Sequence, residues 1–245
     1  QTRNEGQYVR TRLSDDLGSL ETPLTIEHND GFFLSLLEAS IRNYARATLP
    51  QVDPTTLGVE LHSPVTWDEA AVTPWRCLLI GETPVDLLRE TDLVLALNPP
   101  STLDDHTWIR PGTAMRILHM TTDHAKRVVD VAHRHRIDYV AFDAGWYGLG
   151  YRQEHNPESD ATQPVKGLDV EAVAEYAEAR DLGVILYVNW AALRRQLDEI
   201  LPLYQSWGVD GVKFGYVDGR SQEGINFVHR AVEACADHRL VVDVH

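Results

Sequence analysis

Charged, amide and aromatic side chains stand at or near the ends of apolar runs in the second half of the chain. These candidates are His119, Asp143, Trp146, Asn189, Trp190, Lys213, Asp243 and His245. Carboxylates, amides and lysine can bind hydroxyl groups, and an indole ring offers a flat apolar face. A pyranose ring presents both kinds of surface, so this mixture of side chains indicates a carbohydrate site.

Lys213 is unusual because it lies inside an otherwise apolar run, residues 211–215. Burying an unpaired charge is costly, so we expect this lysine to be paired or to face a polar cavity. Asp243 and His245 are two residues apart, which places their side chains on the same face of a strand. An alternative is that Lys213 forms a Schiff base in an aldolase-like enzyme.

Apolar runs alternate with amphipathic segments after Pro111, and this alternation must position the candidates. The pattern predicts strands at 113–120, 138–143, 183–189, 210–215 and 239–245, and helices at 121–136, 168–181, 191–208 and 221–238. Continuous apolar runs are typical of parallel strands covered on both faces, as in a doubly wound sheet or a (β/α)8 barrel. The runs lack a dinucleotide-binding or phosphate-binding glycine motif, which favours the barrel. Functional groups of a barrel stand at the C-terminal ends of its strands.

The first half of the chain contains short apolar stretches separated by turn residues. The stretches at 22–39, 56–65, 74–81 and 91–100 predict short antiparallel strands, whereas 36–45 is compatible with a strand or a short helix. We expect a β-sandwich or part of one, which needs further sequence before Gln1.

Composition excludes several partners. The 245 residues carry a net charge of −15, which repels nucleic acids and anionic membrane surfaces. The chain lacks an apolar stretch long enough to span a bilayer, so we expect neither a membrane span nor a nucleic-acid partner. A neutral substrate fits this charge better.

Several longer segments together resemble glycoside hydrolase family 97. They are ETPLTIEHNDGFFLSLLEASIRNYA, PWRCLLIGETPVDLL, WIRPG, YVAFDAGWYG, GVILYVNWAALRRQLDEILPLYQSWGVDGVKFGYVDG and LVVDVH. The resemblance implies a calcium-dependent exo-acting α-glycosidase with an N-terminal β-super-sandwich and a central (β/α)8 barrel. Residues 1–108 would then be the end of the sandwich domain, and 109–245 the first five strands of the barrel.

The resemblance also assigns roles to residues. It implies that Glu38 binds the active-site calcium and that Lys213 and His245 line the sugar subsite, with Asp143, Trp146, Asn189 and Trp190 as further substrate-binding candidates. The general acid and the other calcium ligands would lie beyond residue 245. A periplasmic or secreted location is more in keeping with the family than a cytoplasmic one.

Gly215 stands where retaining members of the family carry an aspartate nucleophile. Inversion needs room for a water molecule opposite the leaving group, and a glycine would provide it. The resemblance places Asn189 where inverting members have a glutamate, and an amide cannot act as a base. The base is therefore a carboxylate after His245, or Asp218 or Asp243 in a modified site, or missing; we favour the first.

The sequence thus predicts an α/β protein that releases terminal α-linked glucose or galactose from oligosaccharides or other α-glycosides, with inversion and assisted by calcium. The alternative is a catalytically silent, carbohydrate-binding relative, which would bind sugars without hydrolysing them.

Overall fold

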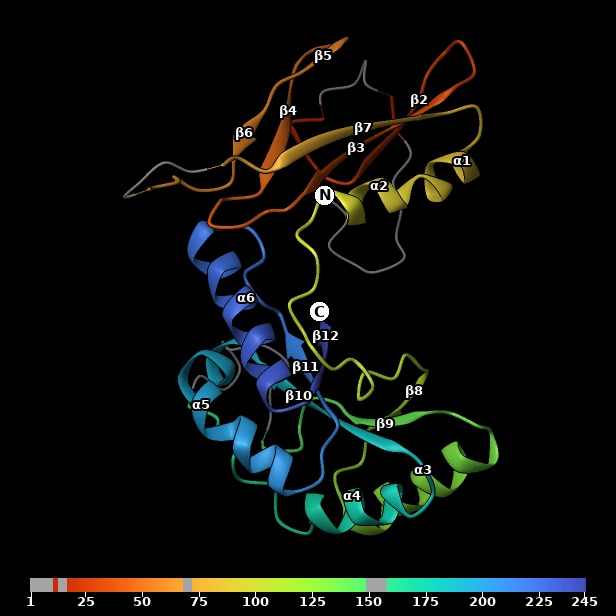
Figure 1. Cartoon of the computed structure of the whole chain (residues 1–245), viewed down its shortest axis with the longest axis vertical. Coiled ribbons are helices and arrows are strands. Elements are labelled where there is room, and N and C mark those ends of the chain that lie inside the picture. The colour runs from red at the N-terminus through yellow and green to blue at the C-terminus, as the bar shows by residue number, and fades with distance from the viewer. Residues whose placement is uncertain (1–10, 13–16, 68–71, 149–157) are drawn as a thin grey trace. The chain divides into compact units, whose positions relative to one another are not determined.

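A computed structural model describes residues 11–12, 17–67, 72–148 and 158–245 (Figure 1). The chain divides into two compact units, which are described separately. The first unit comprises residues 1–102 together with 219–226, and the second comprises 103–218 together with 227–245. Among the described helices, none is both long and apolar enough to cross a membrane.

Short antiparallel strands form two sheets in the first unit. One sheet contains β2 (Leu24–Glu27), β3 (Phe33–Ala39) and β7 (Trp75–Gly81), in that order. The other contains β1 (Ser19–Glu21), β4 (Ala47–Asp53), β5 (Thr56–Leu57) and β6 (Glu60–Leu61), with β4 pairing to the other three. The ambiguous stretch 36–45 therefore begins as a strand and contains no helix.

The prediction of a strand at 91–100 was wrong, because this stretch contains a helix. α1 (Pro84–Arg89) is followed directly by α2 (Thr91–Ala96), and both helices contact β3. The start of α1 is fixed by Thr83, whose backbone N–H donates to the Asp86 carboxylate at 2.8 Å. Proline at the first helical position and this reciprocal cap favour a helix for α1, and α2 follows it directly without a side-chain cap of its own at Glu90.

Five parallel strands and four helices are found among the described residues from 103 onward, and the start of the last helix, up to residue 226, belongs to the first unit (Figure 1). The strands are β8 (Ala114–Ile117), β9 (Tyr139–Phe142), β10 (Gly183–Asn189), β11 (Gly211–Gly215) and β12 (Val241–Val244). The helices are α3 (Thr122–Arg134), α4 (Val170–Glu178), α5 (Trp190–Ser206) and α6 (Gln222–Asp237). The strands lie in sequential order in one sheet, which confirms the predicted parallel arrangement; a closed barrel stays a prediction.

The two faces of the parallel sheet differ in character. Ile117, Phe142, Leu186, Val212 and Phe214 belong to the apolar core, which the sheet forms with residues of the helices. Successive side chains of a strand alternate between faces, so the intervening positions face the other way. This second face carries Arg116, Asp143, Tyr187, Lys213 and Asp243, and we call it the polar face.

Candidate functional site

An ion pair fixes Asp143 at the C-terminal end of β9. Its Oδ2 lies 2.8 Å from Nε of Arg116 on the neighbouring strand, and its Oδ1 accepts a hydrogen bond from the backbone N–H of Ala144 at 2.8 Å. The Asp143 side chain is largely buried, and burial of a carboxylate requires this kind of compensation. Asp143 is therefore preorganised as a charged group on the polar face.

A second ion pair joins β11 and β12. Lys213 and Asp243 are direct neighbours in the register of these strands, and Lys213 Nζ lies 3.6 Å from Asp243 Oδ2. This confirms the expectation that Lys213 is paired. The lysine side chain is 24% exposed and the aspartate 55%, so both groups remain accessible to a ligand.

An aromatic pair stands beside these charges at the C-terminal end of the sheet. The ring of Tyr216 meets the imidazole of His245 edge to face, with centroids 5.6 Å apart. Tyr216 has a φ of 55°, a left-handed conformation that costs a non-glycine residue on the order of 1–3 kcal/mol. Strain of this kind concentrates at functional sites. Asp218, two residues further on, is half-buried.

The space beside Gly215 is filled by Tyr187. A Cβ atom on Gly215 would overlap the phenol of Tyr187 at its hydroxyl oxygen and Cζ, and Tyr187 is only 2% exposed. A residue without a side chain is needed at position 215 because the ring of Tyr187 occupies the adjacent space. The expectation that Gly215 opens room for a water molecule was therefore wrong.

Trp146 lies in the core, and the prediction that it offers a face to a sugar was wrong. It is 0% exposed, and its indole N–H donates to the backbone oxygen of Tyr187 at 2.7 Å. Its ring packs against Tyr147 with centroids 4.8 Å apart, and against Tyr204 and Trp207. Trp146 therefore stabilises the sheet from the helix side.

Asn189 is the N-cap of α5. Its Oδ1 accepts from the N–H of Ala192 at 2.9 Å, and its Nδ2 donates to Ser159 Oγ at 3.1 Å. Its own N–H donates to the hydroxyl of Tyr147 at 2.8 Å. Burial raises the pKa of Tyr147 to about 12. Because the buried Asn189 amide is engaged on both ends, its predicted role in substrate binding was wrong.

Trp190 also belongs to the core. It is buried, and its ring edge meets Phe227 of α6 with centroids 5.0 Å apart. The prediction of an aromatic platform at Trp190 was therefore wrong.

Four of the predicted residues lie on the polar face or at its end: Asp143, Lys213, Asp243 and His245. The structure adds three residues that the sequence analysis did not name as candidates: Arg116, Tyr187 and Tyr216.

The three residues added by the structure differ in whether the sequence could have identified them. Arg116 interrupts an apolar run, as Lys213 does, and could have been found by the same argument. Nothing in the sequence around Tyr187 marks it as a site residue. Its place on the polar face follows from the sheet register, in which Tyr187 lies opposite Lys213 of the neighbouring strand. Tyr216 is distinguished by a backbone conformation that the residue type does not predict.

Glu38 on β3 carries a buried oxygen that has no hydrogen-bond partner among the described residues. Its Oε2 accepts from the N–H of Ala47 at 2.9 Å and from Thr22 Oγ1 at 3.3 Å, whereas its Oε1 accepts no hydrogen bond from the described residues. An unsatisfied buried carboxylate oxygen is costly, and a cation would satisfy it. Glu38 therefore fits the role of a calcium ligand. The described residues contain no group of three or more His, Cys, Asp or Glu side chains that could hold a metal ion.

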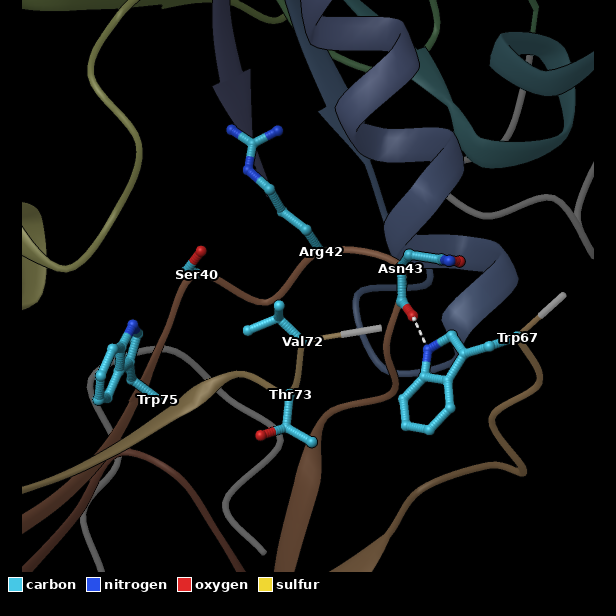
Figure 2. Close-up of a pocket in the computed structure, with 7 residues that line it drawn as sticks. All are labelled: Ser40, Arg42, Asn43, Trp67, Val72, Thr73 and Trp75. Carbon is cyan, nitrogen blue, oxygen red and sulfur yellow. Dashed lines mark hydrogen bonds between the residues drawn. The ribbon is translucent and has the colours of Figure 1, made fainter. Parts of the chain in front are cut away.

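A pocket of about 300 Å³ lies in the first unit (Figure 2). It is lined by Ser40, Arg42, Asn43, Trp67, Val72, Thr73 and Trp75. Trp67 is held by a hydrogen bond from its indole N–H to the backbone oxygen of Asn43 at 3.3 Å, and Trp75 is 56% exposed. Figure 2 shows the two indoles on opposite sides of the pocket, with Val72 and Thr73 between them. The lining combines aromatic faces with hydroxyl and amide groups.

Comparison with known proteins connects both halves of the chain to one family. Residues 108–245 match the family model described as Glycoside hydrolase 97, and residues 1–100 match the one described as Glycosyl-hydrolase 97 N-terminal. A retaining alpha-galactosidase of Bacteroides thetaiotaomicron is 25% identical over 97% of this chain and 41% of its own length. A probable retaining alpha-galactosidase of Streptomyces bingchenggensis is 30% identical over 74% of this chain and 29% of its own length.

Solved structures agree with these matches. A Glycoside Hydrolase Family 97 enzyme from Pseudoalteromonas sp. strain K8, in complex with acarbose, superposes with a TM-score of 0.83 and 26% identity, over 94% of this chain and 41% of that one. A crystal structure of a beta-arabinopyranosidase shares the fold, with a TM-score of 0.69 and 20% identity over 89% of this chain and 37% of that one. The chain thus spans less than half the length of these relatives.

These matches also bear on the prediction of inversion. Both alpha-galactosidase relatives are described as retaining, which conflicts with that prediction. Its physical basis was the space beside Gly215, which Tyr187 fills. The argument from Gly215 to inversion therefore fails.

The family model of Glycoside hydrolase 97 covers more than half of the sequence, and a second model of the same family matches most of the rest. The chain belongs to glycoside hydrolase family 97.

Proposed function

We propose that the protein carrying this chain hydrolyses α-glycosides and releases terminal α-linked glucose or galactose from oligosaccharides. The observation that carries the proposal is the accessible Lys213–Asp243 pair at the C-terminal ends of parallel strands, beside Tyr216 and His245. Family 97 membership and relatives that act on α-galactosides or bind acarbose and panose support the same substrate class.

The polar face can bind a neutral sugar through charge-assisted hydrogen bonds. Lys213 offers donors and Asp243 offers acceptors, and both are the groups that recognise paired hydroxyls. Glycoside hydrolysis requires two carboxyl groups on opposite sides of the scissile bond. Asp218 and Asp243, near the ends of β11 and β12, are the candidates for one of them within this chain.

Calcium is part of the proposal, with Glu38 as one ligand through its unsatisfied Oε1. When bound, calcium would supply positive charge that stabilises developing negative charge on an oxygen atom. The role of Glu38 is to hold the cation by its carboxylate, while Ala47 N–H and Thr22 Oγ1 fix the orientation of that carboxylate. A periplasmic or secreted location and closure of the sheet into a barrel belong to the same proposal.

The test uses p-nitrophenyl α-glucoside and p-nitrophenyl α-galactoside with the full-length protein, its Asp243→Asn variant and an Asp198→Asn control. Asp198 is an exposed residue of α5. We expect release of p-nitrophenol by the wild type, a loss of about tenfold or more in kcat/KM for Asp243→Asn, and no loss for the control. Saturable sugar binding without release of p-nitrophenol would instead identify the catalytically silent relative.

A further inference from the structure

The strand β10 extends beyond its neighbour β9 at the C-terminal end of the parallel sheet. Phe142, the last residue of β9, pairs with a residue three positions before the end of β10. The N–H of Gly183 donates to the backbone oxygen of Asp138, so every second residue from Gly183 onward directs its backbone groups toward the side of β9. The backbone oxygen of Tyr187 and the N–H of Asn189 therefore lie on this side, past the end of β9.

Two aromatic side chains from the loop after β9 bind the backbone groups that the strand does not reach. Trp146 donates its indole N–H to the backbone oxygen of Tyr187 at 2.7 Å. The hydroxyl of Tyr147 accepts from the N–H of Asn189 at 2.8 Å. All four residues are buried, and an unpaired backbone group in a buried place is costly. These two hydrogen bonds therefore hold the start of the loop against β10.

Trp146 is itself fixed by its surroundings. Its ring is 0% exposed and packs against Tyr204 and Trp207, with centroids 5.8 Å and 6.4 Å apart. Its backbone oxygen accepts from the N–H of Val165 at 2.8 Å. A ring held by close packing and by hydrogen bonds of its side chain and backbone keeps one orientation, so Trp146 is a fixed point beside β10.

Asp143 lies three residues before this fixed point, and its own link to the sheet is weak. Its N–H lies 3.5 Å from the backbone oxygen of Ile117, longer than the usual distance of about 2.9–3.0 Å. The side chain of its partner Arg116 is 59% exposed and can follow the carboxylate. Gly145 has a φ of 112°, which glycine adopts readily, and completes the turn from Asp143 on the polar face to Trp146 in the core.

We infer that Trp146 is a positioning residue for Asp143. Its indole N–H fixes the turn 143–146 to the backbone of β10, and the fixed turn sets where the Asp143 carboxylate lies on the polar face. Displacement of a group that binds substrate by about 1 Å can lower the rate by about a hundredfold, so a core residue can control turnover in this way. The effect on turnover rests on the proposed function, whereas the effect on the turn does not.

Two variants of the full-length protein separate the hydrogen bond from the packing. Trp146→Phe removes the indole N–H and leaves an aromatic ring in the core. Trp207→Phe is the matched control, because it removes the same atoms from the same aromatic cluster, and the indole N–H of Trp207 donates to none of the described residues. Hydrogen exchange of residues 143–148 and steady-state kinetics with p-nitrophenyl α-glycosides are measured for each, at a temperature at which the variant is folded.

We expect Trp146→Phe to raise exchange in residues 143–148 by about tenfold or more, while β10 and β11 keep their protection. We expect kcat/KM to fall by about tenfold, and Trp207→Phe to match the wild type in both measurements. Benzothienylalanine in place of Trp146 exchanges the N–H for sulfur at nearly constant shape. It should reproduce both effects, and it decides the question if Trp146→Phe does not fold.

A double-mutant cycle tests whether Trp146 acts through Asp143. Asp143→Ala should lower kcat/KM by about tenfold to a hundredfold, because it removes a charged hydrogen-bonding group. In the Asp143→Ala background, Trp146→Phe should lower kcat/KM by less than about threefold further, since the group that it positions is already absent. A residue that only stabilises the fold would give independent, additive effects.

The inference is overturned by any of three results. The first is unchanged exchange of residues 143–148 without the indole N–H, and the second is an equal rise in Trp146→Phe and Trp207→Phe. The third is a full tenfold effect of Trp146→Phe in the Asp143→Ala background. A wild type that hydrolyses no α-glycoside would contradict the proposed function instead, and the exchange data would still decide whether Trp146 holds the turn.

Discussion

The phenol of Tyr187 on β10 covers Gly215 on β11, so that the glycine has no room for a side chain. A Cβ atom at residue 215 would overlap the Tyr187 hydroxyl oxygen and ring. Gly215 and Tyr187 are both buried residues in the interior of the sheet. A side chain can therefore be added at residue 215 only if the ring of Tyr187 moves or is removed.

Gly215→Ala should lower the free energy of unfolding by about 1–3 kcal/mol, because the added methyl group overpacks a buried region. Gly219→Ala is the matched control, since a Cβ there meets nothing within 4 Å. Urea denaturation measures both. The double variant Tyr187→Ala/Gly215→Ala should lose less than the sum of the two single variants. Equal stability of Gly215→Ala and Gly219→Ala would contradict the proposed overlap.

Tyr147→Phe should lower the free energy of unfolding by about 1–3 kcal/mol, because it leaves the buried N–H of Asn189 without its acceptor. Tyr176→Phe removes a hydroxyl that donates to the partly exposed Asp130, so this control should lose less. Chemical denaturation at about pH 7 compares the two.

The raised pKa of Tyr147 predicts that stability depends on pH in the alkaline range. Burial raises this pKa from 10.0 to about 12, so the folded protein keeps a proton that the unfolded chain loses. Stability of the wild type should therefore fall as the pH rises from about 10 to 12. Tyr147→Phe should show a smaller decline. An identical decline in both proteins would contradict the assignment.

Asp210→Asn should gain stability relative to wild type as the pH rises from about 4 to 7. Desolvation by burial raises the pKa of Asp210, although its Oδ2 accepts from the N–H of Val184 at 2.8 Å. The folded state binds its proton more tightly than the unfolded chain, so the wild type loses stability on ionisation. An asparagine keeps an acceptor and has no such loss.

Asp138→Asn is the control for Asp210→Asn, because the fold lowers the pKa of Asp138 and raises that of Asp210. Hydrogen bonds from the N–H and hydroxyl of Thr113 lower the pKa of Asp138. That carboxylate stabilises the fold at neutral pH and loses its effect as the pH falls through its folded pKa. Asp138→Asn should therefore be more destabilising at about pH 7 than at about pH 3. The same trend in both variants would refute these assignments.

Glu38→Gln should abolish stabilisation by calcium. If Glu38 is a ligand, calcium at about 100 times its dissociation constant stabilises the wild type by about 2.7 kcal/mol, seen as a rise in Tm. Without calcium the variant should be at least as stable as wild type, because an uncharged amide costs less to bury than a carboxylate whose Oε1 has no partner among the described residues. Glu60→Gln, at an exposed strand position, should respond to calcium like the wild type. An undiminished response of Glu38→Gln would exclude Glu38 as a ligand.

The alternation of strands and helices in the second unit was predictable because apolar periodicity and helix caps are local properties of the chain. The wrong strand at 91–100 had a local signal as well: Thr83, Pro84 and Asp86 form a helix start just before it. Asn189 could similarly have been identified as a cap, since it precedes the helical run of α5.

The candidate site was less predictable, because a strand end can present a side chain to either face of the sheet. The cost of burying a charge, which sequence can reveal, correctly predicted that Lys213 is paired, whereas sequence left open which face of the sheet Asp243 occupies. Trp146 and Trp190 carry no charge, so sequence could not distinguish a ligand platform from the core that both residues join. Tyr187 depends on register, and register is set by contacts distant in sequence.

The charges of the polar face cancel locally, although the whole chain carries −15. Arg116 neutralises Asp143, and Lys213 neutralises Asp243, within the two ion pairs. An uncharged sugar approaching this surface experiences little long-range attraction or repulsion. If the polar face binds a neutral sugar, as proposed, the association rate should therefore be insensitive to ionic strength.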